Sequence, residues 1–236
     1  MPPFPLAADD ESASVAPQQQ RTLQSALCHV RWIGGPPDAG KSTVADTLAH
    51  TYALPVYHFD RREMDHLARA TPTRHPHLYA LQAHLATLDE QEWLEENWVR
   101  RPVAEMAADA IVCWSERVDL AVEDLLSMPQ DRLIIAEGPG FFPAVIVPLL
   151  STPQQAIFLA PSEAFKRASH ERRAKSAARH RTSDPKRYLR NHIERDLLIA
   201  DYYIQTAHEL GFTLIVVDGS QSVEQIAAEV ATHFGL

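Results

Sequence analysis

A run of glycine, proline and lysine from Gly35 to Thr43 reads Gly-Pro-Pro-Asp-Ala-Gly-Lys-Ser-Thr. A glycine, four residues and then Gly-Lys-Ser is the pattern of a phosphate-binding loop, whose glycines let successive backbone N–H groups form a phosphate-sized nest. In such a loop the lysine, here Lys41, neutralises the β- and γ-phosphates of a nucleotide, and the next hydroxyl, here Ser42, ligates Mg²⁺. The pattern predicts a nucleotide site made by Gly35, Pro36, Pro37, Asp38, Ala39, Gly40, Lys41, Ser42 and Thr43.

The residues around this loop favour the same interpretation. An extended-looking run, 29–33, precedes the loop, and the segment 42–52 follows it with apolar residues on one helical stripe. A strand, a glycine loop and a helix in this order aim the helix N-terminus at a phosphate. The alternative is a Gly/Pro turn that holds a lysine by coincidence.

Short apolar runs that predict strands recur along the chain, with helical patterns between them. The runs are 29–33, 56–59, 133–136, 156–159 and 213–217. Strands that alternate with helices predict an α/β fold, in which a parallel sheet is covered on both faces.

Glycine or an acidic residue follows four of these runs directly. The residues are Gly34, Asp60, Glu137 and Asp218. Because ligands of open α/β sheets bind beyond the carboxyl ends of the strands, we expect the functional residues at these positions.

The gap between the second and third strands, 61–131, is too long for a simple crossover. Helix-like stretches occupy it at 61–70, 76–88, 90–108 and 116–127, and it carries Trp93, Trp98 and Trp114. We interpret the gap as a helical insertion that binds the second substrate. For any one of these tryptophans, a place in the core between helices is the simpler interpretation.

Positive charge is concentrated in one part of an acidic chain. The formal net charge is −9, yet 166–195 holds eleven Lys and Arg against three Asp and Glu. One basic segment on an acidic body argues against general nucleic-acid binding, which uses a broad basic face. It suits a lid, placed at 162–195, that meets a polyphosphate, or else a solvated arginine-rich helix.

Composition limits the remaining possibilities. The 236 residues are 45% hydrophobic and 22% charged, as in soluble globular proteins, and no apolar run approaches the roughly 20 residues that span a bilayer. Two cysteines, without a secretory signal, favour the cytoplasm. Residues 1–24, rich in proline and glutamine, suggest a disordered leader.

Four features occur in the order typical of P-loop kinases of small molecules: the loop at 35–43, Glu-Gly at 137–138, the arginine-rich segment and Val-Asp-Gly at 217–219. Over 28–234 the chain resembles this group, which includes shikimate kinase, nucleoside monophosphate kinases, uridine kinase-like enzymes and chloramphenicol phosphotransferase. The resemblance implies a three-layer P-loop NTPase fold over 25–236, with a five-stranded parallel sheet ordered 2-3-1-4-5. It also implies ATP and Mg²⁺ as cofactors.

The resemblance implies roles for the acidic residues at the strand ends. Asp60 stands where several such kinases place an aspartate that contacts the acceptor hydroxyl, and a carboxylate there could accept the hydroxyl proton. A helix cap is the alternative, since Glu63 follows three residues later. Glu137, after an apolar strand, is similar to the Walker B acid that reaches Mg²⁺ directly or through water.

Other residues carry weaker expectations. Among the lid arginines, Arg173 and Arg179 are our choices for stabilising the transferred phosphoryl group. Asp218 resembles the segment that borders adenine in this group. Asp38 departs from loops of this type, which more often carry glycine there, and its charge would repel phosphate unless it points away, pairs with a cation, or binds Mg²⁺ or the acceptor.

Together these residues predict a phosphotransferase that moves the γ-phosphate of ATP to a hydroxyl of a small molecule. A nucleoside or nucleoside monophosphate kinase is the nearest alternative, and Arg61 or Arg62 would then bind the acceptor phosphate. A switch that hydrolyses NTP without a kinase reaction, and a binding module impaired by Asp38, also remain open. The sequence does not identify the acceptor, the nucleobase preference or the oligomeric state.

Overall fold

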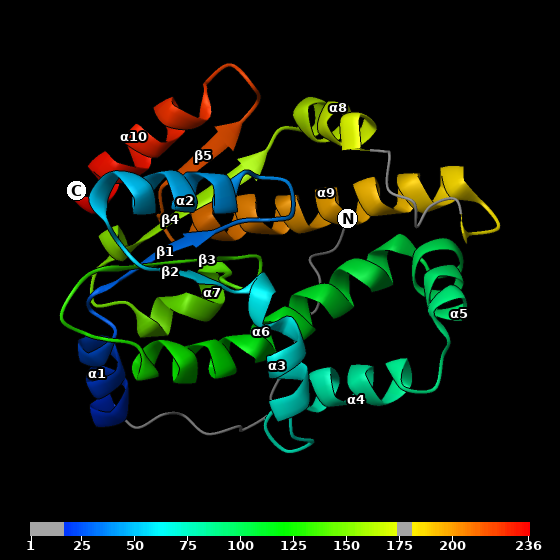
Figure 1. Cartoon of the computed structure of the whole chain (residues 1–236), viewed down its shortest axis with the longest axis horizontal. Coiled ribbons are helices and arrows are strands. Elements are labelled where there is room, and N and C mark those ends of the chain that lie inside the picture. The colour runs from blue at the N-terminus through cyan, green and yellow to red at the C-terminus, as the bar shows by residue number, and fades with distance from the viewer. Residues whose placement is uncertain (1–16, 174–180) are drawn as a thin grey trace.

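A five-stranded parallel sheet lies at the centre of the computed structural model, which describes residues 17–173 and 181–236 (Figure 1). The strand order is β2-β3-β1-β4-β5, and every neighbouring pair is parallel. The predicted α/β class, the five strands and the order 2-3-1-4-5 are therefore confirmed. The strands are β1 (Val30–Gly34), β2 (Val56–His58), β3 (Ile134–Gly138), β4 (Ala156–Pro161) and β5 (Leu214–Val217).

Helices cover both faces of this sheet, because alternate strand residues point to opposite sides. On β1, Ile33 joins the cluster under α2 (Lys41–Tyr52) and α10 (Val223–Phe234). Trp32 joins the cluster on the other face, with residues of α6 (Val103–Ser127), α7 (Pro143–Ile146) and α9 (Pro185–Glu209). The sheet is thus the middle of three layers.

The segment between β2 and β3 is helical, but its boundaries differ from those that the periodicity predicts. The 3-10 turn η1 (Asp60–Arg62) leads into α3 (Glu63–Arg69), and α4 (Pro76–Leu85), α5 (Glu90–Glu95) and the π-helical turn η2 (Glu96–Arg100) follow. The helix expected at 90–108 is interrupted at Pro102. Arg101, the residue before it, is extended (ψ 146°), as steric contact with a following proline favours.

The long helix α6 also shows that 61–131 is not wholly an insertion. Its C-terminal part packs on the sheet through Val118, Ala121 and Leu125, which are buried with Trp32 in one cluster. Within 61–131, the part that precedes these residues of α6 extends beyond the sheet (Figure 1).

Residues 17–24, assigned above to a disordered leader, belong to helix α1 (Pro17–Ala26). The side chain of Gln24 donates a 3.1 Å hydrogen bond to the carbonyl of Pro148, and Ser151 Oγ donates to the carbonyl of Gln24. Leu23 packs against the core, and Leu27, four residues later, is buried in it. This apolar pair anchors the helix despite its polar composition; residues 1–16 lie outside the described part of the chain.

The remaining elements follow the strands of the second half. Two 3-10 turns, η3 (Val147–Leu149) and η4 (Pro153–Gln155), precede β4, and α8 (Glu163–Arg173) follows it. No helix among the described residues is long and apolar enough to cross a membrane.

Candidate phosphate-loop site

The 35–43 loop joins β1 to the N-terminus of α2, as predicted. A Cβ atom at Gly35 would lie only 2.0 Å from the carbonyl oxygen of Leu159, so the backbone passes β4 too closely for a side chain. Gly40 has a φ of 79° and immediately precedes α2. Exposed Ser42 and Thr43 follow on the first helical turn. The helix N-terminus therefore opens at the loop, an arrangement suited to an anion.

Lys41 is buried at the start of α2, with 6% of its surface exposed. Its Nζ donates a 2.8 Å hydrogen bond to the carbonyl oxygen of Pro36, within the loop. Burial lowers the pKa of Lys41, whereas the nearby charges of Glu137, Asp60, Asp38 and Asp196 act to raise it. The structure thus brings the loop lysine together with three predicted site acids, and with one that the sequence did not single out.

Glu137 is buried at the end of β3 and has one unpartnered oxygen. Its Oε1 accepts a 2.8 Å hydrogen bond from Nδ1 of His58, and Nε2 of His58 lies 3.2 Å from Oδ1 of Asp46. Glu137 Oε2 is buried without a hydrogen-bond partner among the described residues. A buried oxygen without a partner costs free energy that a cation or an ordered water would relieve. A carboxylate oxygen is a ligand that a hard divalent cation prefers.

His58 is a site residue that the sequence analysis does not predict, although it holds Glu137 in place. The signal was available in the predicted strand order: His58 ends β2, which is next to β3, and pairs in register with Glu137. A histidine that holds one oxygen of a candidate metal ligand fixes the direction of the other oxygen.

Asp60 is exposed at the start of η1, directly after β2. The helix-cap interpretation is not supported, because the caps of η1 and α3 are Phe59 and Arg62, and neither makes a side-chain capping bond. The charge of Asp60 acts on Lys41 and also on Arg117, a guanidinium that is 1% exposed.

Arg117 lies under this strand end and is held by backbone and ring contacts. Its guanidinium donates a 2.8 Å hydrogen bond to the carbonyl of Phe59 and stands 4.1 Å over the Phe59 ring. Burial lowers the pKa of Arg117, and the acids Glu63 and Asp60 raise it. Arg117 is the one arginine of α6, and no motif in the residues around it predicts a place at the site.

Asp38, the unusual residue of the loop, pairs with a cation. Lys166, on α8, is fully buried, and its Nζ lies 2.7 Å from Asp38 Oδ2 and 2.5 Å from Asp196 Oδ2. Arg195 contacts the other oxygen of Asp196 at 2.6 Å. Two cations thus face two carboxylates, and the charge of Asp38 is compensated. Asp38 also adopts a φ of 65°, a left-handed conformation that aspartate tolerates better than most residues.

Lys166 is the cation that Asp38 and Asp196 share. We expect Lys166→Met to lower the free energy of unfolding by about 3 kcal/mol, because removing one partner leaves two carboxylates largely buried without their shared cation. Urea denaturation followed by circular dichroism measures this change, with the exposed Lys186→Met as the matched control. A loss equal to that of the control would mean that Asp38 is not paired in solution.

The arginines considered in the sequence analysis are not all placed at the loop. Arg173 ends α8 with a side chain outside the described part of the structure, and Arg179 lies wholly outside it. Arg181, a further arginine of the 162–195 segment, pairs at 2.5 Å with Glu90 of α5. Arg62, a candidate for an acceptor phosphate, instead donates to Asp124 and Asp65.

Asp218 forms a turn of its own after β5. Its Oδ1 accepts hydrogen bonds from the backbone N–H and the hydroxyl of Ser220, and these bonds lower the pKa of Asp218. Its side chain is therefore used within the turn.

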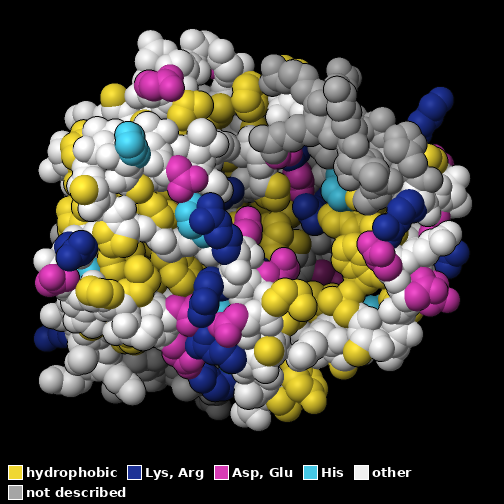
Figure 2. Space-filling model, viewed as in Figure 1, with side chains coloured by type: hydrophobic (Ala, Val, Ile, Leu, Met, Phe, Trp, Pro, Cys, Tyr) yellow, Lys and Arg dark blue, Asp and Glu magenta, His cyan; other side chains and the backbone are white. Residues whose placement is uncertain are grey.

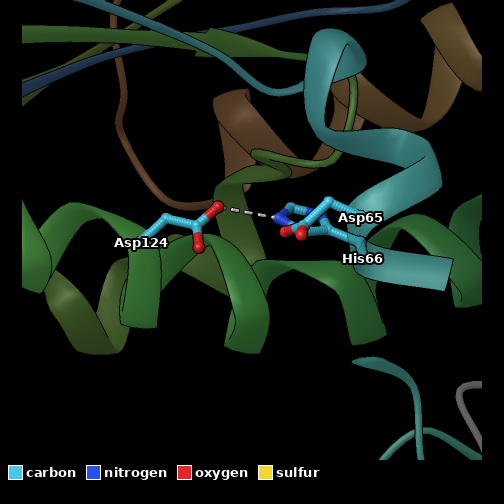
Figure 3. A group of neighbouring side chains, drawn as sticks. All are labelled: Asp65, His66 and Asp124. Atoms are coloured by element: carbon cyan, nitrogen blue, oxygen red, sulfur yellow. Dashed lines mark hydrogen bonds and ion pairs between the residues drawn. The ribbon is translucent and has the colours of Figure 1, made fainter. Parts of the chain in front are cut away.

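Asp65, His66 and Asp124 form the one group of metal-ligating side chains found among the described residues (Figure 3). Its oxygens are already occupied. Asp124 accepts hydrogen bonds from Arg69, His66, Tyr57 and Arg62. A cation would have to compete with two arginines there, so we interpret the group as a clamp between α3 and α6 and not as a metal site.

Asp124 is the central acceptor of this clamp. Burial raises the pKa of Asp124, but hydrogen bonds from Arg69, His66, Tyr57 and Arg62 outweigh it and bring the pKa from 3.8 to about 2. The stabilisation is present above pH 3.8 and is lost as the pH falls through about 2. It amounts to about 2 kcal/mol.

We therefore expect Asp124→Asn to lower the free energy of unfolding by about 2 kcal/mol at neutral pH. The variant should also lack the part of the acid destabilisation that the wild type shows between pH 4 and 2. Denaturant titrations at several pH values measure both effects, and Asp131→Asn, an exposed site, is the control. Equal acid sensitivity in variant and wild type would contradict the clamp.

No family model and no curated protein matches this chain. Among solved structures, that of YorR protein from Bacillus subtilis, in complex with phosphorylated GDP, aligns over 86% of this chain and 94% of that chain. The TM-score is 0.39 and the sequence identity is 13%. A likeness this distant leaves the assignment of function to the site itself.

Proposed function

We propose that this protein is a P-loop phosphotransferase that transfers the γ-phosphoryl group of ATP to a hydroxyl of a small molecule. One observation carries the proposal: a buried lysine at the N-terminus of α2 stands among acids, and one of them, Glu137, keeps a buried oxygen without a partner. Such a combination of anion-binding loop, cation and unsatisfied carboxylate suits a nucleotide phosphate with its Mg²⁺.

Each group has a role in this reaction. Backbone N–H groups of 35–43 and the ammonium of Lys41 would bind the β- and γ-phosphates. Ser42 and Glu137 would hold Mg²⁺, which when bound neutralises charge that develops on the transferred group. Asp60, exposed at the neighbouring strand end, would orient the acceptor hydroxyl and accept its proton as the O–P bond forms.

The pairing of Asp38 bears on the alternatives. With Lys166 at 2.7 Å, Asp38 does not present an isolated charge to a phosphate, which supports a working loop over an impaired binding module. Arg62, engaged by Asp124 and Asp65, gives no support to a monophosphate acceptor. A switch that hydrolyses NTP shares the same loop and is separated by experiment.

The test is mass-spectrometric detection of phosphoryl transfer from Mg·ATP to a panel of nucleosides, nucleotides, sugars, hydroxy acids and hydroxylated ring compounds. We expect at least one phosphorylated product, lost in Lys41→Met. Hydrolysis of ATP at the same rate with and without every acceptor would instead favour the switch. Loss of nucleotide binding in the wild type, measured by calorimetry, would contradict both.

A further inference from the structure

The helices between β2 and β3 enclose a cavity of about 600 Å³ together with α9. This volume is in the range of small-molecule sites. The face shown in Figure 2 is hollowed, with hydrophobic, acidic and basic side chains exposed at the hollow. The cavity lining includes three tryptophans, Trp93, Trp98 and Trp114, which the sequence analysis placed in a substrate-binding region.

Two lining residues connect the cavity to the proposed reaction site. Glu63 lies three residues after Asp60, at the start of α3. Arg195 is bonded to Asp196, which contacts Lys166 and through it Asp38 of the loop. An acceptor in the cavity is therefore bordered by Glu63, which lies one turn from Asp60, and by Arg195, which three successive contacts join to the phosphate loop.

The charges around the cavity do not suit an anion. Three carboxylates, Glu63, Glu96 and Asp109, line it against two guanidinium groups, Arg101 and Arg195, and His84 pairs with Glu96 at 3.3 Å.

Both lining arginines already serve carboxylates: Arg101 pairs with Asp109, and Arg195 donates from Nε and from a terminal nitrogen to Asp196. A phosphate or carboxylate on the acceptor would have to compete with these pairs and would meet Glu63 and Glu96 besides.

The apolar part of the lining is mainly aromatic. The rings of Trp93 and Trp98 contact edge to face at 6.3 Å, and the Arg195 guanidinium stands 4.5 Å from the Trp98 ring and 5.8 Å from that of Trp114. Leu81 and Met106 complete an apolar wall. Aromatic side chains pack well against the ring of a planar ligand, and their faces attract cations more than anions.

We infer that the acceptor is an uncharged or cationic hydroxyl compound built on a flat, apolar ring system, and that it binds in this cavity. That this ligand is the phosphoryl acceptor rests on the proposed function. The preference for uncharged or cationic ring compounds rests on the cavity alone. Recognition comes from the tryptophan-lined wall. Discrimination against anions comes from lining arginines that are already paired and from carboxylates that outnumber these arginines in the lining.

The test measures binding without nucleotide, so its failure is distinguishable from a failure of phosphoryl transfer. Saturation-transfer NMR would screen a library of hydroxyl compounds made of matched pairs: tyramine with 4-hydroxyphenylacetate, thymidine with thymidine monophosphate, and aromatic alcohols with sugars of similar size. We expect binders to be chiefly the uncharged or cationic ring compounds, each at least tenfold tighter than its anionic counterpart.

A variant that fills the cavity locates the binding. Ala80 is an exposed lining residue, so Ala80→Trp should block the cavity with little effect on the core and weaken these binders at least tenfold. The exposed-site control Lys186→Met should leave their binding unchanged. Binders that are mainly anionic, binders that Ala80→Trp does not affect, or a library without binders would each overturn the inference.

Discussion

Lys41→Met should lower kcat for phosphoryl transfer by roughly a thousandfold, the range seen when a positioned charge is removed from a developing transition state. Lys41 is the lysine that belongs to the loop motif itself, and methionine fills a similar volume without the charge. Because charge on the transferred group grows in the transition state, most of the loss should appear in kcat and less in KM. Single-turnover and steady-state kinetics with Mg·ATP measure the effect.

The same variant should not unfold the protein. Burial lowers the pKa of Lys41 below its ordinary 10.5, so the ammonium is less favourable in the folded state than in water. Between the folded and unfolded pKa values the unfolded state binds more protons, and the stability of the wild type rises with pH there. Lys41→Met should lack this rise and should be at least as stable at neutral pH.

Lys186→Met, at an exposed lysine, controls for the loss of one positive charge. Wild-type kinetics in Lys41→Met would contradict the proposed role of the loop. A collapse of stability would instead make Lys41 a structural group that balances Glu137, Asp60 and Asp38.

Local patterns were enough to predict the sheet and the loop, because their signals lie within short segments. The strands β3 and β4 are buried on both faces and so read as continuous apolar runs, as Ile134 and Ile135 illustrate. In the loop, Gly40 is favoured by its own positive φ, whereas Gly35 is required by the close approach to β4.

The partners of the site residues could not be predicted in the same way, because they come from distant parts of the chain. Lys166 and Arg195 were counted as charges of a basic lid, yet Lys166 is fully buried and both balance carboxylates. The contact of Lys166 with Asp38 joins residues 128 positions apart, and a local sequence pattern cannot predict such a contact. The basic charge of 166–195 that is free to meet a phosphate is therefore smaller than the sequence count.

Glu137→Gln should have the second large effect, on the metal rather than on the phosphate. Glutamine keeps the shape of Glu137 and can still offer an oxygen to His58, but it removes the negative charge and one carboxylate oxygen. A hard divalent cation depends on such an oxygen, so we expect kcat to fall by roughly a hundredfold or more. The Mg²⁺ concentration for half-maximal rate should rise at least tenfold, as for a lost ligand.

A readout apart from activity decides whether Oε2 of Glu137 faces the cation. Electron paramagnetic resonance of Mn²⁺ with a non-hydrolysable ATP analogue should show weaker metal binding in Glu137→Gln than in the exposed control Glu209→Gln. His58→Phe should weaken Mn²⁺ binding by a smaller factor, because it frees the carboxylate to rotate without removing it. Unchanged Mn²⁺ binding in Glu137→Gln would mean that the unpartnered oxygen accepts a hydrogen bond from water. The phosphates and Ser42 alone would then ligate Mg²⁺.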